Sequence, residues 1–334
     1  MENHQYSYSQ LAANALPQFL TMHYDFAERP RCKYYVLGLH DNYLVECGSD
    51  KYIFRVYRNS WRTETQILFE LELLAYLGRK KSPVAAPLPT KTGQYCFTID
   101  SPEGLRFATL FRYAKGRAPG SGITASTSAL LGAAVATVHY DAVGFTTTQS
   151  RPLLDLPYLL TESIDAILPF IEPQEREFLK RLEIDLSGQL NRLTGTTPGH
   201  SICIGDVNLS NFHIDTDNTV TIFDFDQCGY GHRAFEIGKF VSSIHSLENK
   251  QEIAAAFIQG YEKIFALKED EFAAIPLYEK VSVIWVMAIH AYNAERIGHK
   301  WLEKPFWDRR FAVLRDLEQH PTILKKSPIV AGKP

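Results

Sequence analysis

Cysteine and long apolar runs are both scarce in this chain of 334 residues. The five cysteines are scattered and odd in number, and no two form a C-x-x-C pair, which argues against a disulfide framework or a zinc site. The longest apolar run, residues 281–289, is much shorter than the roughly 20 residues that a membrane-spanning helix needs. The opening MENHQYSYSQ has no basic stretch followed by an apolar segment. We therefore expect a cytoplasmic protein with no secretory signal and no membrane partner.

An excess of charge of either sign is also missing. The 35 basic and 38 acidic residues leave a formal net charge of -3, which gives no reason to expect a nucleic-acid partner. Hydrophobic residues make up 45% and charged residues 22% of the chain, a composition typical of globular proteins. The composition favours a soluble globular enzyme.

The first third of the chain is rich in strand-forming segments. A small antiparallel sheet carrying one helix is predicted, because a helical pattern at 64–78 has Ile67, Leu71 and Leu74 on one face and ends at Gly78. A short helix at 10–16 is expected to end near Pro17. The predicted strands are 34–39, 42–47, 51–58, 95–99 and 107–113.

Helices dominate the rest of the chain. The glycine-rich segment 116–122 is the predicted boundary, giving a lobe at 1–114, a helical lobe at 115–325 and a tail at 326–334. The fold class is therefore α+β. The predicted helices are 125–140, 156–168, 173–193, 236–247, 250–265, 270–298 and 306–318, with short strands at 202–204, 213–215 and 220–225.

Polar side chains converge in the segment HSICIGDVNLSNFHIDTDNTVTIFDFD at 200–226. Asp206 follows a short strand, Asn211 comes five residues later, and Asp224 and Asp226 follow the next strand pair. Phosphoryl transfer from a nucleotide needs such a set, because one carboxylate orients the attacking hydroxyl while amide and carboxylate oxygens hold Mg²⁺. Taken alone, Asp206 and Asn211 could form a surface turn, and the two later acids could be solvated.

Several segments, in this order, resemble the kinase-like phosphotransferases, which include aminoglycoside phosphotransferases, choline kinases and type II homoserine kinases. G-D-x-x-x-x-N followed by D-F-D is similar to that family's catalytic loop and metal motif. The resemblance implies a bilobal protein-kinase-like fold and ATP and Mg²⁺ as cofactors. It extends to LGLHDNYLVE, IFRVYR, ILFELELLAYL, LGAAVATVH and DFDQCGYGHRAFEIGKF.

Residue roles follow from the resemblance. It implies Asp206 as the catalytic aspartate, Asn211 and Asp224 as Mg²⁺ ligands, and Arg55 as a phosphate contact supported by Glu70. The remaining implied nucleotide contacts are Asn42 and the hinge at 110–114 with Phe111 and Tyr113, and the acceptor-side candidates are Asp226, Glu236, His290, Tyr292 and Glu295.

Two residues depart from the family pattern. Ile204 stands where the family has a histidine before Gly-Asp, and an isoleucine cannot make that hydrogen bond, so a more loosely held loop is expected. Arg55 stands where lysine is common, and its guanidinium presents a fork to phosphate oxygens. His139 lies on an apolar helix face and is expected to be a core residue.

The predicted function is transfer of the γ-phosphate of ATP to a hydroxyl of a small molecule: an aminoglycoside, amino alcohol, homoserine or sugar-like acceptor. One alternative is a degenerate kinase that binds nucleotide as a regulatory module, favoured only by Ile204. A Ser/Thr protein kinase of the same fold is another, although nothing resembles an A-P-E segment. An aspartyl-phosphate phosphatase is disfavoured, because D-F-D continues with Gln227-Cys228.

Overall fold

The computed structural model describes residues 6–194 and 201–324. Contacts between residues divide the chain into two compact units. The first unit takes the described residues up to Lys115 together with 144–151 and 221–223. The second takes 116–143, the described part of 152–220, and the described residues from Asp224 onwards.

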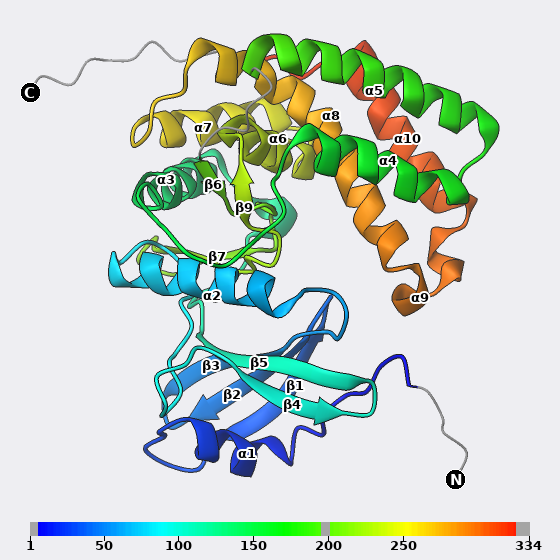
Figure 1. Ribbon diagram of the computed structural model, residues 1–334. Helices are drawn as coiled ribbons and strands as arrows, with labels where there is room; N and C mark the ends of the chain where they lie inside the picture. The colour runs from blue at the N-terminus through cyan, green and yellow to red at the C-terminus, as the bar shows by residue number, and fades with distance from the viewer. Residues whose placement is uncertain (1–5, 195–200, 325–334) are drawn as a thin grey trace, which may run out of the picture. The chain divides into compact units, whose positions relative to one another are not determined.

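The first unit is built on a five-stranded antiparallel sheet with the strand order β1-β2-β3-β5-β4. Helices α1 (Leu16–His23) and α2 (Glu64–Arg79) lie on opposite faces of it (Figure 1). Successive side chains of a strand point to opposite faces of the sheet, so each helix packs on one set of side chains. The strands are β1 Arg31–Leu37, β2 Asp41–Cys47, β3 Asp50–Val56, β4 Phe97–Ser101 and β5 Gly104–Arg112.

Helix α1 corrects the expectation of a helix at 10–16 that stops near Pro17. The helix begins at Leu16, and Pro17 occupies its first turn, where the missing N–H has no partner to lose. Leu16 and Leu20, with Tyr24 just beyond the helix, are buried against the sheet residues Tyr43, Val45, Phe54, Val56, Ala108 and Leu110. The error came from treating the proline as a stop when it marks a start.

Helix α2 agrees with its predicted position and starts with a capping box formed by Thr63 and Gln66. Its buried face includes the predicted Ile67, Leu71 and Leu74. Glu70, a charged residue, lies on this face with no exposed surface.

The second unit is mostly helical. Helices α3 (Ala125–Asp141) and α7 (Lys250–Glu262) approach until their backbones touch: a Cβ on Gly132 would lie 2.0 Å from the carbonyl oxygen of Phe257, and one on Gly260 would lie 1.9 Å from that of Ala129. The other helices are η1 Gly120–Gly122, η2 Pro157–Thr161 (a π-helical turn), α4 Glu162–Ile167, η3 Leu168–Phe170, α5 Pro173–Thr194, α6 Arg233–Ser243, α8 Glu269–Tyr292, α9 Ala294–Ile297, η4 His299–Leu302 and α10 Lys304–Gln319.

Four short strands belong to the segment that carries the motif. β6 (Ser201–Cys203) pairs with β9 (Gly229–Gly231), and β7 (Phe212–Ile214) pairs with β8 (Val220–Ile222). Strand β9 was not predicted, because Gly-Tyr-Gly has low strand propensity and gains its partner only from β6. The α+β organisation predicted from the sequence is confirmed.

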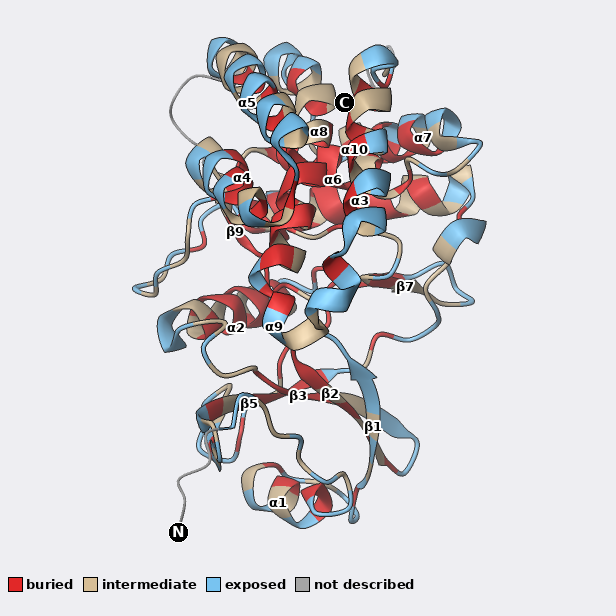
Figure 2. Ribbon diagram, turned by 90° about the vertical axis from the view of Figure 1, so that its right-hand side faces the viewer, coloured by how far each residue is buried: buried red, intermediate tan, exposed pale blue. Residues whose placement is uncertain are grey.

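Helix α8 is the one helix in the described residues that is long and apolar enough to cross a membrane. In its most apolar window, 61% is buried inside the protein. Figure 2 shows α8 with α6 in the buried part of the second unit. We interpret α8 as the central core helix of that unit, and the predicted helix 270–298 is divided at Asn293 between α8 and α9.

Glu279 is a buried carboxyl group inside α8, and in the described structure its Oε2 has no hydrogen-bond partner. Burial raises the pKa of Glu279 from 4.5 to about 7, and a hydrogen bond with Thr322 opposes the shift only partly. The folded state therefore keeps a proton that the unfolded chain releases, so this group lowers stability as the pH rises from 4.5 to 7.

Replacing Glu279 by glutamine is expected to stabilise the protein more at pH 8 than at pH 5. The raised pKa of Glu279 corresponds to about 3 kcal/mol at most above pH 7. Thermal or urea unfolding of E279Q and wild type across this range measures the difference, with the exposed E252Q as the matched control. An E279Q effect that does not change with pH would contradict the ionisation argument.

Candidate active site

Arg55 is held on β3 by groups from three other elements of the first unit. It lies in the sheet between Asn42 and Thr109, and its Nε donates to Asn42 Oδ1 at 3.2 Å. Its Nη1 forms an ion pair with Glu70 Oε1 of α2 at 3.4 Å. The guanidinium carbon lies 5.3 Å from the ring centroid of Phe111. The predicted residues Arg55, Glu70, Asn42 and Phe111 are therefore together in the structure.

The Arg55–Glu70 pair is almost completely shielded from water. Arg55 is 8% exposed and Glu70 is 0% exposed. The second carboxylate oxygen of Glu70 accepts from the hydroxyl of Tyr57 at 3.2 Å, so both of its oxygens have partners. A buried pair of this kind fixes the direction of the guanidinium, and losing one partner leaves a charge uncompensated.

Tyr113 lies just beyond the end of β5. Burial raises the pKa of Tyr113, with a further contribution from its hydrogen bond to Tyr35. The ammonium of Lys51 lies 5.9 Å from the centroid of the Tyr113 ring. These two contacts join Tyr113 to residues of β1 and β3.

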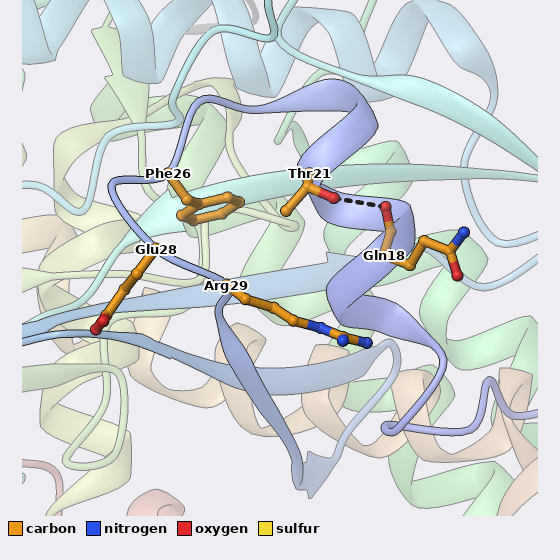
Figure 3. A pocket seen from close by; sticks show the side chains of 5 residues that line it. All are labelled: Gln18, Thr21, Phe26, Glu28 and Arg29. Atoms are coloured by element: carbon orange, nitrogen blue, oxygen red, sulfur yellow. Dashed lines mark hydrogen bonds between the residues drawn. The ribbon is translucent and has the colours of Figure 1, made fainter.

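A different cavity in the first unit is lined by residues of α1 and the segment that follows it (Figure 3). It encloses about 500 Å³ and lies on the α1 side of the sheet, whereas Arg55 and Glu70 lie on the α2 side. None of the predicted site residues lines it. Its lining residues are Gln18, Thr21, Phe26, Glu28 and Arg29.

The loop that carries Asp206 begins with a sharp bend in the second unit. Gly205 has φ +91°, and a Cβ at this position would lie 2.0 Å from the carbonyl oxygen of Gln227. Only glycine satisfies both conditions. The bend allows the chain leaving β6 to turn directly into Asp206.

Glu236 of α6 holds the backbone of this loop. Its carboxylate accepts hydrogen bonds from the amides of Ile204 and Gly205, the latter at 3.0 Å. The same carboxylate lies 3.3 Å from His139 Nε2, and His139 Nδ1 lies 2.7 Å from the hydroxyl of Tyr261. Glu236 has no exposed surface, so the structure gives it a supporting role in place of the substrate contact expected from the sequence.

The anchor also answers the question raised by Ile204. The isoleucine side chain is fully buried, and its backbone amide, together with that of Gly205, supplies the bonds that fix the loop. The loop is thus held through its main chain at a position where the isoleucine side chain cannot form a hydrogen bond. His200 lies outside the described residues.

His139, Cys203 and Glu236 bring three potential metal-ligating atoms within 4.8 Å of one another. The hydrogen bonds of His139 and Glu236 already use the atoms that a metal would need. Burial raises the pKa of Cys203 well above its usual value, which favours the neutral thiol. We interpret this cluster as a hydrogen-bonded core, in agreement with the expectation for His139.

Asp206 and Asn211 are joined by hydrogen bonds across the loop. Asn211 Nδ2 donates to Asp206 Oδ2 at 3.0 Å and to the Asp206 carbonyl oxygen at 2.9 Å. These bonds use the amide nitrogen, so the amide oxygen, which is the atom a metal ion needs, takes no part in them. The other carboxylate oxygen, Oδ1, forms an ion pair with Lys239 Nζ at 2.8 Å.

Asp224 and Asp226 follow β8. Asn211 precedes β7, and a short turn joins β7 to β8, so Asn211 and Asp224 lie at the same end of this hairpin. Asp224 has φ +64°, in the left-handed region that costs a non-glycine residue roughly 1 kcal/mol, and such strain is concentrated at functional sites. Asp226 is 2% exposed and accepts from Gln227 Nε2 at 3.0 Å, so it lies below the surface.

The remaining acceptor-side candidates lie around the end of α8 and in α9. His290 Nδ1 is 2.8 Å from the carbonyl oxygen of Val286, and burial lowers the pKa of His290. The Tyr292 hydroxyl donates to the carbonyl oxygen of Glu162 at 3.1 Å. Glu295 is exposed and pairs with His299 at 2.9 Å. His290 and Glu295 thus contact residues four positions away in the chain, whereas Tyr292 contacts the start of α4.

Lys239 is a residue of this site that was absent from the sequence prediction. It lies 33 positions after Asp206 and has no motif of its own in a single sequence. Its position three residues after Glu236 on α6, which places both on one helix face, is the only signal in the sequence that could have found it.

Comparison with known proteins agrees with this geometry. Residues 37–274 match the phosphotransferase enzyme family. An uncharacterised protein of Synechocystis sp. is 36% identical over 312 residues, covering 93% of this chain and 86% of that protein. An uncharacterised protein of Deinococcus radiodurans is 31% identical, covering 93% of this chain and 92% of that protein.

Solved structures show the same fold. A microcompartment-associated aminopropanol kinase superposes with a TM-score of 0.73 at 23% identity, covering 94% of this chain and all of that one. An amicoumacin kinase in complex with AMP-PNP and Ca²⁺ has a TM-score of 0.76 at 18% identity, covering 93% of this chain and 95% of that one. With well over half of its length matched by the family, this chain belongs to the phosphotransferase enzyme family and is a phosphotransferase of the kinase-like fold.

Proposed function

We propose that this protein is an ATP- and Mg²⁺-dependent kinase that phosphorylates a hydroxyl group of a small molecule. The observation that carries the proposal is the loop after β6, in which Asp206 stands next to a glycine bend, with Asn211 bonded to its carboxylate. The side chain of Asp206 is 30% exposed, which leaves room for a substrate to approach.

In the proposed reaction Asp206 accepts a hydrogen bond from the acceptor hydroxyl and then its proton. The hydroxyl oxygen forms a bond to the γ-phosphorus while the bond from that phosphorus to the bridging oxygen of ADP breaks, and ADP leaves with the electron pair. Kinases of this kind depend on positioning and electrostatics more than on covalent chemistry.

The chain offers suitable ligands for a divalent cation. Asn211 contributes an amide oxygen and Asp224 a carboxylate, which are the hard oxygen donors that Mg²⁺ prefers. These two residues would hold Mg²⁺, which would supply positive charge that neutralises part of the phosphate charge. Arg55, whose direction is fixed by Glu70 and Asn42, is proposed to contact the phosphates.

The proposed acceptor is a small hydroxyl compound, and amino alcohols are the first class to test. Structures of the same fold include an aminopropanol kinase, an ethanolamine kinase and a choline kinase. We also propose a cytoplasmic location, which suits five cysteines that are all free thiols.

A two-step experiment tests this function. A thermal-shift screen with AMP-PNP, with and without Mg²⁺, first reports nucleotide binding, because a ligand of the folded state raises the melting temperature. Amino alcohols, sugars, homoserine and aminoglycosides are then incubated with ATP and Mg²⁺, and ADP release and the phosphorylated product are measured. We expect product for at least one acceptor, and none when EDTA is present.

Two other outcomes would replace the proposal. Mg²⁺-dependent nucleotide binding without phosphorylation of any acceptor would favour the degenerate kinase. The hydrogen bonds from the Ile204 and Gly205 amides to Glu236 argue against this alternative, because they hold the loop that carries Asp206. Phosphorylation of a protein substrate but no small molecule would favour a Ser/Thr protein kinase.

A further inference from the structure

We propose that Lys239 positions the catalytic carboxylate of Asp206; this inference depends on the function proposed above. The ammonium of Lys239 lies 2.8 Å from Asp206 Oδ1, at the distance of a charge-assisted hydrogen bond. Asn211 Nδ2 donates to the other oxygen, Oδ2, at 3.0 Å. Each oxygen of the carboxylate therefore has its own donor.

Helix α6 supplies Lys239 from a buried part of the second unit. Every residue from Arg233 to Val241 is buried. Glu236 and Lys239 are three residues apart, so both lie on the face of α6 that meets the loop. Glu236 holds the loop backbone and Lys239 holds the side chain that the backbone carries.

Lys239 and Asp206 are buried to different extents, and this difference indicates what the ion pair does. The Lys239 side chain is 5% exposed, whereas the Asp206 side chain is 30% exposed. Burying an ammonium is unfavourable, and a long apolar side chain at position 239 would fill the same space without that cost. A charge retained in such a place points to a task at Asp206, since stability alone does not require it.

The task is to fix the direction of the carboxylate. A carboxylate bound at one oxygen only can rotate about its side-chain bonds towards solvent. Donors on both oxygens restrict that rotation and leave the remaining lone pairs in fixed positions for the acceptor hydroxyl. Displacing a reacting group by about 1 Å can reduce turnover about 100-fold.

Kinetic comparison of Lys239→Met with Lys239→Arg and the exposed control Lys263→Met, using an acceptor found in the screen described above, tests the proposal. We expect Lys239→Met to lower kcat about 10- to 100-fold, with the KM for ATP and the affinity for AMP-PNP and Mg²⁺ changed less than about twofold. Lys239→Arg, which keeps the charge, is expected to recover a large part of kcat. A kcat for Lys239→Met equal to that of Lys263→Met would overturn the inference.

A double variant separates positioning from folding. If Lys239 acts only through Asp206, then Asp206→Asn/Lys239→Met has the same residual turnover as Asp206→Asn alone. Independent, multiplicative losses would show that Lys239 acts by another route and would contradict the proposal.

Unfolding measurements cover the case in which Lys239→Met folds poorly. Asp206→Ala leaves the buried ammonium without this carboxylate, so it is expected to lower the melting temperature, and adding Lys239→Met is expected to restore it. No restoration would contradict the pairing. An inactive wild type would remove the proposed function and this inference together, whereas an active wild type insensitive to Lys239→Met would remove only the inference.

Discussion

Replacing Asp206 by asparagine is expected to lower kcat by about 10²- to 10⁴-fold, the range typical of general acid–base groups. Asparagine keeps the size of the side chain and an oxygen for Lys239, but it cannot take the hydroxyl proton. Steady-state assays with the acceptor found in the screen measure the loss. Calorimetry with AMP-PNP and Mg²⁺ is expected to show binding close to that of the wild type.

Asp217 provides the matched control for this substitution. It is an exposed aspartate in the turn between β7 and β8, at the other end of the hairpin from Asn211, so Asp217→Asn removes one carboxylate without touching Asp206 or Asn211. Turnover close to wild type is expected for this control. Full activity of Asp206→Asn would show that the catalytic role belongs to another residue.

Replacing Arg55 by methionine is expected to affect both nucleotide binding and stability. The substitution removes a fork of donors for phosphate, worth about 1.5–3 kcal/mol or roughly 10- to 100-fold in affinity. It also leaves the fully buried Glu70 without its cation, which typically costs about 3–5 kcal/mol of unfolding free energy. Nucleotide titration and urea unfolding measure the two effects separately.

A second substitution separates the two effects of Arg55→Met. Adding Glu70→Gln removes the uncompensated charge, so the double variant is expected to regain stability but not nucleotide affinity. Arg31→Met, at an exposed position of β1, is the control for loss of a positive charge from the sheet. Wild-type affinity in Arg55→Met would contradict the proposed phosphate contact.

Much of the first unit could be predicted from local patterns. The helix at 64–79 was visible because Ile67, Leu71 and Leu74 repeat at helical spacing, and Glu70 falls on the same face. Arg55 was placed on a strand by alternation, whereas its pairing with Glu70 was implied only by the resemblance to the kinase-like phosphotransferases. Helix α1 was misplaced because proline can either end a helix or occupy its first turn, and only packing against Tyr43 and Phe54 decides between them.

The supports of the loop could not be predicted in the same way. Glu236 was predicted among the acceptor-side candidates. Its contact with the amides of Ile204 and Gly205 was missed, because a single sequence does not show which residues meet in the fold. Lys239 was missed for the same reason. Such contacts join residues about 30 positions apart, and their partners become neighbours only after the helices have packed.

The carboxylate of Glu236 receives the loop amides and also meets the imidazole of His139 on α3, which in turn meets Tyr261 on α7. Substitutions at positions 139, 236 and 261 therefore cannot be tolerated independently, because each changes the surroundings of the other two. Among homologous chains these three sites are expected to coevolve as a group. Exchanging one of these residues between two homologues should preserve the fold only when the other two are exchanged with it.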